Sequence, residues 1–198
     1  MEIKAQMVKE LREQSGAGIM DCKDALREAG GNLDQASKLL RKKGLASAGR
    51  RSQRATREGS VGSYIHAGGR IGVLVEVNCE TDFVARTDEF QKLVKDLAMH
   101  VAAAAPQYVR REEVPAEILE REREILMEQA RSSGKPEQIL EKMVEGRLNK
   151  FFAELCLEEQ PFVRDADQAV LEIVQMVAVK TGENIKVRRF SRFVLGEQ

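Results

Sequence analysis

The sequence predicts an α+β fold, in which a helical N-terminal part precedes a small antiparallel three-stranded sheet packed with helices. Three observations support this prediction. Apolar residues recur at helical spacing over residues 3–44, the period changes to two from Val61 onward, and long helical stretches follow the strands. We expect a three-helix module over residues 1–45, a basic linker over 46–58 and an α+β core over 59–198.

The N-terminal module is predicted as three short helices in succession. The first has one apolar face and ends at residues 15–18, and the second runs from about Met20 to Ala29. The third has the strongest signals, because Asn32 is a good N-cap and Gly44 is suited to the position just after a helix.

The core is expected to contain three strands. From Val61 the apolar residues alternate, which is typical of a strand with one buried side. The Gly68-Gly69 pair predicts a hairpin turn before a second strand over residues 71–79. A third strand is expected over residues 185–195.

Helices are expected to fill the rest of the core. One begins at a capping pair headed by Asp88 and ends at Pro106. Residues 115–157 are predicted to be helical, with a turn over residues 132–136, and a last helix is expected over residues 168–180.

The composition excludes several classes of protein. Hydrophobic residues make up 42% of the chain and charged residues 32%, which is too apolar for a disordered chain. Basic and acidic residues both number 32, which disfavours a uniformly basic wrapper of nucleic acid. No apolar run approaches the length of a membrane helix, and charges interrupt the N-terminus where a signal peptide would be apolar. We therefore expect a soluble, cytoplasmic protein.

The motifs of catalysis are missing or incomplete. The pair Gly134-Lys135 lacks the first glycine of a phosphate-binding loop, and Gly16-Ala17-Gly18 lacks the third glycine of a dinucleotide fingerprint. The three cysteines, Cys22, Cys79 and Cys156, have neither disulfide-framework nor zinc-site spacing. Both histidines, His66 and His100, are interpreted as packed or surface residues. We expect no catalytic residues, no metal and no cofactor, and hence a binding protein.

A basic stretch over residues 41–57 is the first candidate binding site. Its lysines and arginines are suited to phosphates or an acidic partner, as in an RNA- or ribosome-associated helical adaptor. A solvated linker explains the same residues equally well, because RNA-binding modules usually add aromatic residues, and this stretch has none.

The segment Thr81–Arg86 is the second candidate, because it joins a strand to a helix and carries Phe83. The spacing leaves two interpretations open. Phe83 either folds back onto the sheet, which the usual burial of aromatic residues favours, or stands on a rigid turn beside Asp82 and enters a pocket of a partner.

Three stretches of the sequence closely resemble the translation elongation factor Ts family, the nucleotide-exchange factors of elongation factor Tu. They are VKELR with SGAGIMD at residues 8–12 and 15–21, GVLVEVNCETDFVAR at 72–86, and GENI at 182–185. The run NCETDFVAR is the most specific. Ser15 and Ile19 depart conservatively from the residues common in the family. The chain has one strand–strand–helix repeat, whereas long members carry a duplicated core and an inserted coiled coil.

The resemblance implies that the chain is an exchange factor without covalent chemistry, which releases guanosine diphosphate from elongation factor Tu by displacing Mg²⁺ and distorting the phosphate site. It also implies that residues 1–45 form a module of the ubiquitin-associated type. A role in binding ubiquitin itself is disfavoured by the full second domain. The implied contacts lie in two groups: Thr81, Asp82, Phe83 and Val84 at the magnesium site, and Val8, Arg12, Ile19, Met20 and Lys23 in the N-terminal module.

A homodimer is the last expectation, with neither a membrane nor a nucleic acid as a direct partner. A three-stranded sheet leaves a small core and an unprotected edge, and the final strand over Val187–Leu195 is more apolar than a chain terminus requires. A two-fold partner would cover this surface. Alternatively, helices over residues 115–131 and 135–157 fold over it and leave a monomer.

Overall fold

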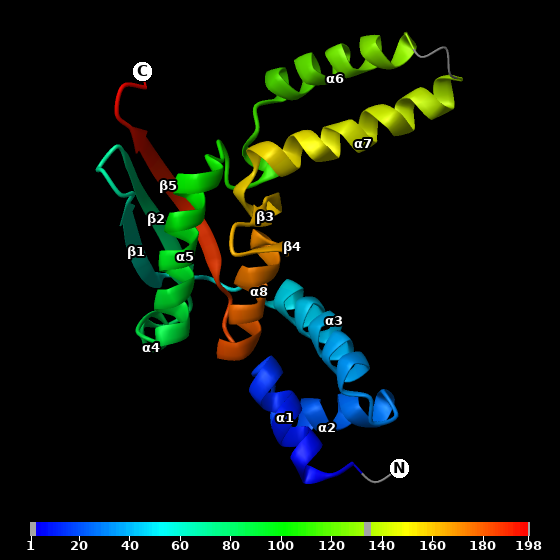
Figure 1. The fold of residues 1–198 in the computed structure, drawn as a ribbon, viewed down its shortest axis with the longest axis vertical. Coiled ribbons are helices and arrows are strands. Elements are labelled where there is room, and N and C mark those ends of the chain that lie inside the picture. Colours follow the sequence, from blue (N-terminus) through cyan, green and yellow to red (C-terminus); the bar gives the residue numbers. More distant parts are fainter. Residues whose placement is uncertain (1–2, 133–135, 198) are drawn as a thin grey trace. The chain divides into compact units, whose positions relative to one another are not determined.

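The computed structural model of the protein describes residues 3–132 and 136–197, and for residues 45–50 it describes the backbone alone. The architecture is α+β, as predicted, and Figure 1 shows the elements in chain order. The helices are α1 (Ala5–Ser15), α2 (Ile19–Glu28), α3 (Leu33–Arg51), α4 (Asp82–Ala85), α5 (Asp88–Ala104), α6 (Ala116–Arg131), α7 (Glu137–Leu155) and α8 (Val170–Thr181). The strands are β1 (Glu58–Ile65), β2 (Ile71–Cys79), β3 (Pro161–Phe162), β4 (Asp165–Ala169) and β5 (Lys186–Val194).

The chain divides into two compact units. The first consists of Met1–Ser60, Val77–Leu93 and Glu172–Lys186, and the second of Val61–Glu76, Val94–Leu171 and Val187–Gln198. The boundaries fall inside β1, β2, α5, α8 and β5, so each unit is assembled from segments that are distant in the sequence. The proposed division of the chain at residues 45 and 58 stays a prediction.

The three predicted N-terminal helices are present as α1, α2 and α3. They share a small core, and its buried members are Leu11, Cys22, Ala25, Leu26, Ala36 and Leu40. The predicted cap of α3 is confirmed, because the Gln35 amide donates to Asn32 Oδ1 at 2.9 Å. These helices are held by apolar burial on one shared face.

The expectation that α3 ends at Gly44 is wrong, since the helix continues to Arg51. A glycine inside a helix costs only about 1 kcal/mol relative to alanine. Here it permits close packing, because a Cβ on Gly44 would lie 3.1 Å from a methyl carbon of Val179 on α8. The Arg51 guanidinium also donates to the Ala178 carbonyl at 3.4 Å, so contacts with α8 hold the extra turns.

The main sheet has the strand order β1-β2-β5 and is antiparallel. Its hairpin is the predicted one, with Gly68 and Gly69 at φ values of 86° and 69° that favour glycine. The inward residues of β2 are buried, namely Val73, Val75, Val77 and Cys79. β5 supplies the predicted third strand.

Helix α5 covers the predicted residues, but its cap differs from the expectation. The hydroxyl of Thr87, one residue before Asp88, accepts from the Phe90 amide at 3.3 Å. The same hydroxyl donates to the Val84 carbonyl at 2.8 Å, so it also joins α5 to the short helix α4. Threonine, like aspartate, is among the preferred N-cap residues, so a cap one residue before Asp88 is compatible with the same sequence.

The second unit contains a pair of helices, α6 and α7, that pack through a cluster of their own (Leu126, Ala130, Leu140 and Val144). The turn predicted at residues 132–136 falls mostly on 133–135, which lie outside the described residues. A two-stranded sheet, β3-β4, was not predicted, because its strands are too short and polar to show a period. No helix in the described parts of the chain is both long and apolar enough to span a bilayer.

Candidate protein-binding site

The segment after β2 forms a single helical turn, α4, and Thr81 is its N-cap residue. Thr81 has extended backbone angles, as N-cap residues do, and its Oγ1 accepts from the Val84 amide at 3.4 Å. Next to it, Cys79 closes the strand in a buried position, with its thiol donating to the Thr81 carbonyl at 3.1 Å. The turn is therefore fixed to the end of the strand on both sides of Glu80.

Phe83 points outward from this turn and is 79% exposed. The two residues that follow, Val84 and Ala85, are buried. Successive residues in a helix point in different directions, so the burial of these two side chains turns Phe83 toward solvent. The interpretation in which Phe83 folds back onto the sheet is therefore wrong.

The other polar groups of the turn are simple in their chemistry. Asp82 forms an exposed ion pair with Arg86 at 2.8 Å, and such pairs contribute little to stability. Burial raises the pKa of Cys79 to about 11, so its thiol stays protonated at neutral pH. A protonated, buried thiol is a poor nucleophile. What the turn offers to a partner is therefore the exposed side chain of Phe83, which can bind but does not react.

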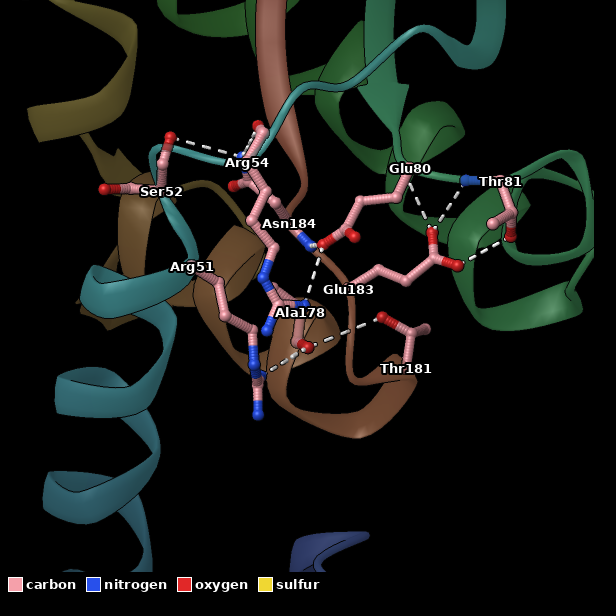
Figure 2. A network of polar contacts seen from close by, with 9 residues as sticks. All are labelled: Arg51, Ser52, Arg54, Glu80, Thr81, Ala178, Thr181, Glu183 and Asn184. Carbon is pink, nitrogen blue, oxygen red and sulfur yellow. Dashed lines mark hydrogen bonds and ion pairs between the residues drawn. The ribbon is translucent and has the colours of Figure 1, made fainter.

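Glu183 lies on the connection between α8 and β5, and its carboxylate holds the turn through hydrogen bonds. One of its carboxylate oxygens accepts from the Glu80 and Thr81 amides, each at 3.0 Å, and the other accepts from the Thr81 hydroxyl at 2.6 Å. Figure 2 shows these three bonds converging on one side chain. A residue more than a hundred positions away in the sequence thus fixes the start of α4.

Asn184 extends this network to the segment that follows α3. Its backbone N–H donates to Glu80 Oε1 at 2.6 Å. Its side-chain amide donates to the Arg54 carbonyl at 2.7 Å and to the Ser52 carbonyl at 3.2 Å. Arg54 completes the arrangement with an ion pair to Glu80 at 3.4 Å, as Figure 2 shows. Asn184 is itself buried, so its polar groups are satisfied internally.

The residues predicted for the N-terminal module lie on α1 and α2. Ile19 and Met20 begin α2 and are 55% and 64% exposed, so two adjacent apolar side chains are presented to solvent. Arg12 is exposed on α1, whereas Val8 and Lys23 are half-buried. The shared core of the module holds the two helices together, so these five residues belong to one packed body.

Several side chains of the basic stretch have acceptors within the protein. Arg41 pairs with Glu172 at 2.6 Å, and Lys43 pairs with Glu28. The contacts of Arg51 and Arg54 are given above. Cations that are already paired internally contribute less to phosphate binding, which disfavours the RNA-binding interpretation.

The second unit exposes an apolar face on the sheet. The exposed residues are Val61 and Ile65 of β1, Leu74 of β2, Phe193 of β5, and Leu195 directly after β5. Of the other apolar residues expected to be available on the last strand, Phe190 and Val194 are half-buried. Clustered exposure of this kind is typical of an interaction surface.

Sequence reasoning assigned no role to Glu183 and Asn184, although it singled out the run over residues 182–185. No local pattern could have linked these residues to Thr81, because the contact depends on how β2 and β5 pair. The same holds for the pairing of Arg54 with Glu80.

Taken together, the fold and this site define a binding protein built around a helical module and an exposed aromatic residue on a rigid turn. The sequence profile of the family described as Elongation factor TS matches residues 33–197. The protein named Elongation factor Ts of Geobacter sulfurreducens is 64% identical over 197 residues, covering 100% of this chain and 91% of that protein. The proteins of the same name from Anaeromyxobacter sp. and Carboxydothermus hydrogenoformans are 61% and 60% identical, with 90% of each covered. The chain belongs to the elongation factor Ts family of translation elongation factors.

Proposed function

We propose that the protein is the guanine-nucleotide exchange factor of elongation factor Tu and acts in the cytoplasm. In this proposal it promotes the release of guanosine diphosphate by displacing Mg²⁺ and distorting the phosphate site. Family membership supports the general role. The observation that carries the finer mechanism is the exposure of Phe83 on a turn that hydrogen bonds hold rigidly.

The mechanism follows from the way nucleotides are held. Mg²⁺ bridges the phosphates of a bound nucleotide and compensates their charge. Loss of the ion leaves phosphate charge uncompensated in a focused site, so the nucleotide leaves faster. The coupling is reciprocal, because a factor that weakens nucleotide binding is itself bound more weakly when nucleotide returns. Guanosine triphosphate then dissolves the complex, and no covalent bond is made or broken.

Phe83 is suited to hold the partner in the distorted state. A phenylalanine buries about 150–250 Å², which corresponds to an upper limit of about 4–6 kcal/mol of transfer free energy at about 25 cal/mol/Å². Association costs consume part of this free energy. A rigid turn keeps that cost small, since little conformational freedom is lost when Phe83 enters its pocket.

The N-terminal module is proposed to supply affinity through Val8, Arg12, Ile19, Met20 and Lys23. Exposed apolar residues at the start of a helix can bury area against a partner without a change of fold. Under this division of labour, the module determines how tightly the partner is bound, and Phe83 determines how fast nucleotide is released once it is bound.

The release of a fluorescent guanosine diphosphate analogue from purified elongation factor Tu tests the proposal. With this protein in excess, the release rate should rise with its concentration to a plateau, far above the rate without it. The plateau reports the release step, and the half-saturating concentration reports binding. A release rate that stays at the level without the protein would refute the exchange function.

Salt dependence separates this proposal from the RNA- or ribosome-associated adaptor. An interface that neutralises phosphates loses affinity steeply with ionic strength, with a slope set by the number of contacts. The half-saturating concentration should rise only weakly with salt if apolar contacts dominate. A steep rise, together with binding to RNA, would favour the adaptor.

A homodimer through the open face of the sheet is also part of the proposal. A second copy would cover Val61, Ile65, Leu74, Phe193 and Leu195, with the same patch meeting itself around a two-fold axis. Sedimentation equilibrium at micromolar concentration should give about twice the chain mass of 22.2 kDa. The variant Phe193→Glu should shift the mass toward the monomer with an unchanged circular dichroism spectrum. A wild-type mass near 22.2 kDa would refute the dimer.

A further inference from the structure

We propose that Glu183 is the positioning residue of the exchange site: its carboxylate holds the Thr81–Val84 turn so that Phe83 projects into the partner. This inference rests on the exchange function proposed above. It assigns that site a residue that lies outside the turn and touches neither nucleotide nor metal in the proposed mechanism. This role is supported by the three hydrogen bonds to Glu183, by the anchoring of Glu183 itself and by the segment to which it belongs.

The three bonds to Glu183 fix both the backbone and the cap of the turn. The Glu80 and Thr81 amides, which donate to one carboxylate oxygen, are the last backbone groups before α4. The Thr81 hydroxyl donates to the other oxygen while it accepts from the Val84 amide. The carboxylate therefore orients the hydroxyl that caps α4, and without it the hydroxyl is free to rotate away from the Val84 amide.

The position of Glu183 is itself well determined. It follows Gly182, whose φ of 76° ends α8 sharply, and it precedes the buried Asn184. The Asn184 amide donates to Glu80 Oε1, and the Asn184 side chain is bound to the two carbonyls after α3. Glu183 is thus held between a helix end and an anchored residue, and it has little freedom to follow a moving turn.

The segment that carries Glu183 is also fixed to the helix that leads out of the N-terminal module. Val179 on α8 packs against Gly44, and Arg41 on α3 pairs with Glu172 on α8. Glu183 and α8 therefore fix the position of the turn relative to α3. A partner bound by the module would meet Phe83 at a set place, which is the condition for distortion of its metal site.

This role makes a specific kinetic prediction. Loss of the carboxylate should let the turn move without unfolding the protein, so binding through the module persists and the release step slows. Three hydrogen bonds to a charged acceptor are lost together, so Glu183→Ala should lower the plateau rate about tenfold or more. The half-saturating concentration should change less than about twofold.

The experiment compares Glu183→Ala, Glu183→Gln and wild type in the nucleotide-release assay, with the factor in excess over elongation factor Tu. In Glu183→Gln an amide oxygen still accepts from the two backbone amides, and the amide nitrogen can donate to the Thr81 hydroxyl. We expect this variant to recover a plateau within about threefold of wild type. The matched control is Glu159→Ala, which removes a carboxylate paired with Arg111 in the second unit, away from the turn, and should keep the wild-type plateau.

A loss of folded protein gives a different signature. An inactive fraction raises the apparent half-saturating concentration and leaves the plateau unchanged, because the folded molecules still saturate the partner. Hydrogen–deuterium exchange of a peptide spanning residues 79–86 adds a readout that does not depend on activity. The Glu80 and Thr81 amides should lose protection in Glu183→Ala, while protection in α5 stays at the wild-type level.

The outcomes separate this inference from the function on which it rests. A wild-type protein that fails to accelerate release refutes the exchange function itself. An active wild type with Glu183→Ala at the wild-type plateau refutes the positioning role, and so does a raised half-saturating concentration at an unchanged plateau. A lowered plateau in Glu183→Ala, recovered in Glu183→Gln and accompanied by local loss of amide protection, supports it.

Discussion

The module surface around Ile19 and Met20 and the turn that carries Phe83 both expose apolar side chains, but different forces hold them in place. The module depends on a small apolar core shared by three helices that are adjacent in the sequence. The turn depends on hydrogen bonds that it donates to the Glu183 carboxylate, which reaches it only through the pairing of distant strands. The first arrangement is typical of a docking surface, which tolerates small movements. The second arrangement fixes the direction in which Phe83 projects, as is required of a side chain that enters and distorts the site of a partner.

The largest effect is expected from Phe83→Ala, which should lower the plateau rate of nucleotide release about 100-fold. The side chain is 79% exposed, so its loss should leave the free energy of unfolding nearly unchanged. Release kinetics and thermal unfolding of the same preparation check both parts. A variant with normal release but a clearly lower melting temperature would show that Phe83 stabilises the fold instead.

Phe90→Ala is the matched comparison, because the same side chain is removed from a fully buried site seven residues after Phe83. It should cost about 3–5 kcal/mol of the free energy of unfolding. The folded fraction should still release nucleotide at the wild-type plateau. Equal effects of the two substitutions on the release rate would show that the exposed Phe83 acts in release no differently from a buried core residue.

A cavity in the module should act on binding instead of release. Leu26→Ala removes a fully buried side chain from the shared core and should cost about 2–5 kcal/mol of stability. Because the docking surface then becomes less ordered, the half-saturating concentration should rise while the plateau is kept. Leu126→Ala, in the separate cluster of α6 and α7, is the control and should leave the half-saturating concentration unchanged. A lowered plateau in Leu26→Ala would contradict the division of labour between the two regions.

The contrast also explains how much the sequence could predict. Helices held by local apolar periodicity were located correctly, as were the glycine hairpin and the strand that alternates over residues 71–79. Errors arose where a distant segment decided the local outcome. Gly44 did not end its helix, because packing against Val179 supports the additional turns.

The candidate site shows the same limit. The resemblance to a known family identified residues 81–84, whereas without it the usual burial of aromatic residues favoured a buried Phe83. Its exposure follows from the burial of Val84 and Ala85 and from the bonds of Thr81, which depend on the three-dimensional fold. Polar contacts over a hundred residues leave no periodic signal, so the role of Glu183 had to come from the structure.

A smaller effect is expected from Asn184→Ala, which removes two side-chain hydrogen bonds to the Arg54 and Ser52 carbonyls. Two carbonyls lose a buried donor, and the cost should be about 1–3 kcal/mol of the free energy of unfolding. The bonds of Glu183 to the turn remain, so the plateau rate should fall much less than in Glu183→Ala. Chemical denaturation and release kinetics measure the two effects. A plateau as low as that of Glu183→Ala would mean that Asn184, and not the carboxylate, fixes the turn.

The smallest effect is expected in the second unit, where the polar contacts of a buried histidine do not involve the turn. His100 Nε2 lies 2.9 Å from Gln160 Oε1, and its Nδ1 accepts from the Val163 amide at 3.3 Å. Since Nδ1 accepts, the ring is neutral with its proton on Nε2. Burial lowers the pKa of His100 below the ordinary histidine value of about 6.5, and the bond to Gln160 opposes this only in part.

The sign of the pH dependence follows from this direction. Because the folded protein disfavours the charged ring, the unfolded chain binds a proton more readily as the pH falls below about 6.5. The contribution of neutral His100 is therefore present above that pH and is lost as the pH falls toward the lower folded pKa. His100→Gln should lose less free energy of unfolding than wild type between about pH 7.5 and about pH 5, measured by urea denaturation. Identical curves for wild type and His100→Gln would show that His100 does not titrate on unfolding. The plateau rate of the folded protein should not follow this titration, because the turn is held by Glu183 in the other unit.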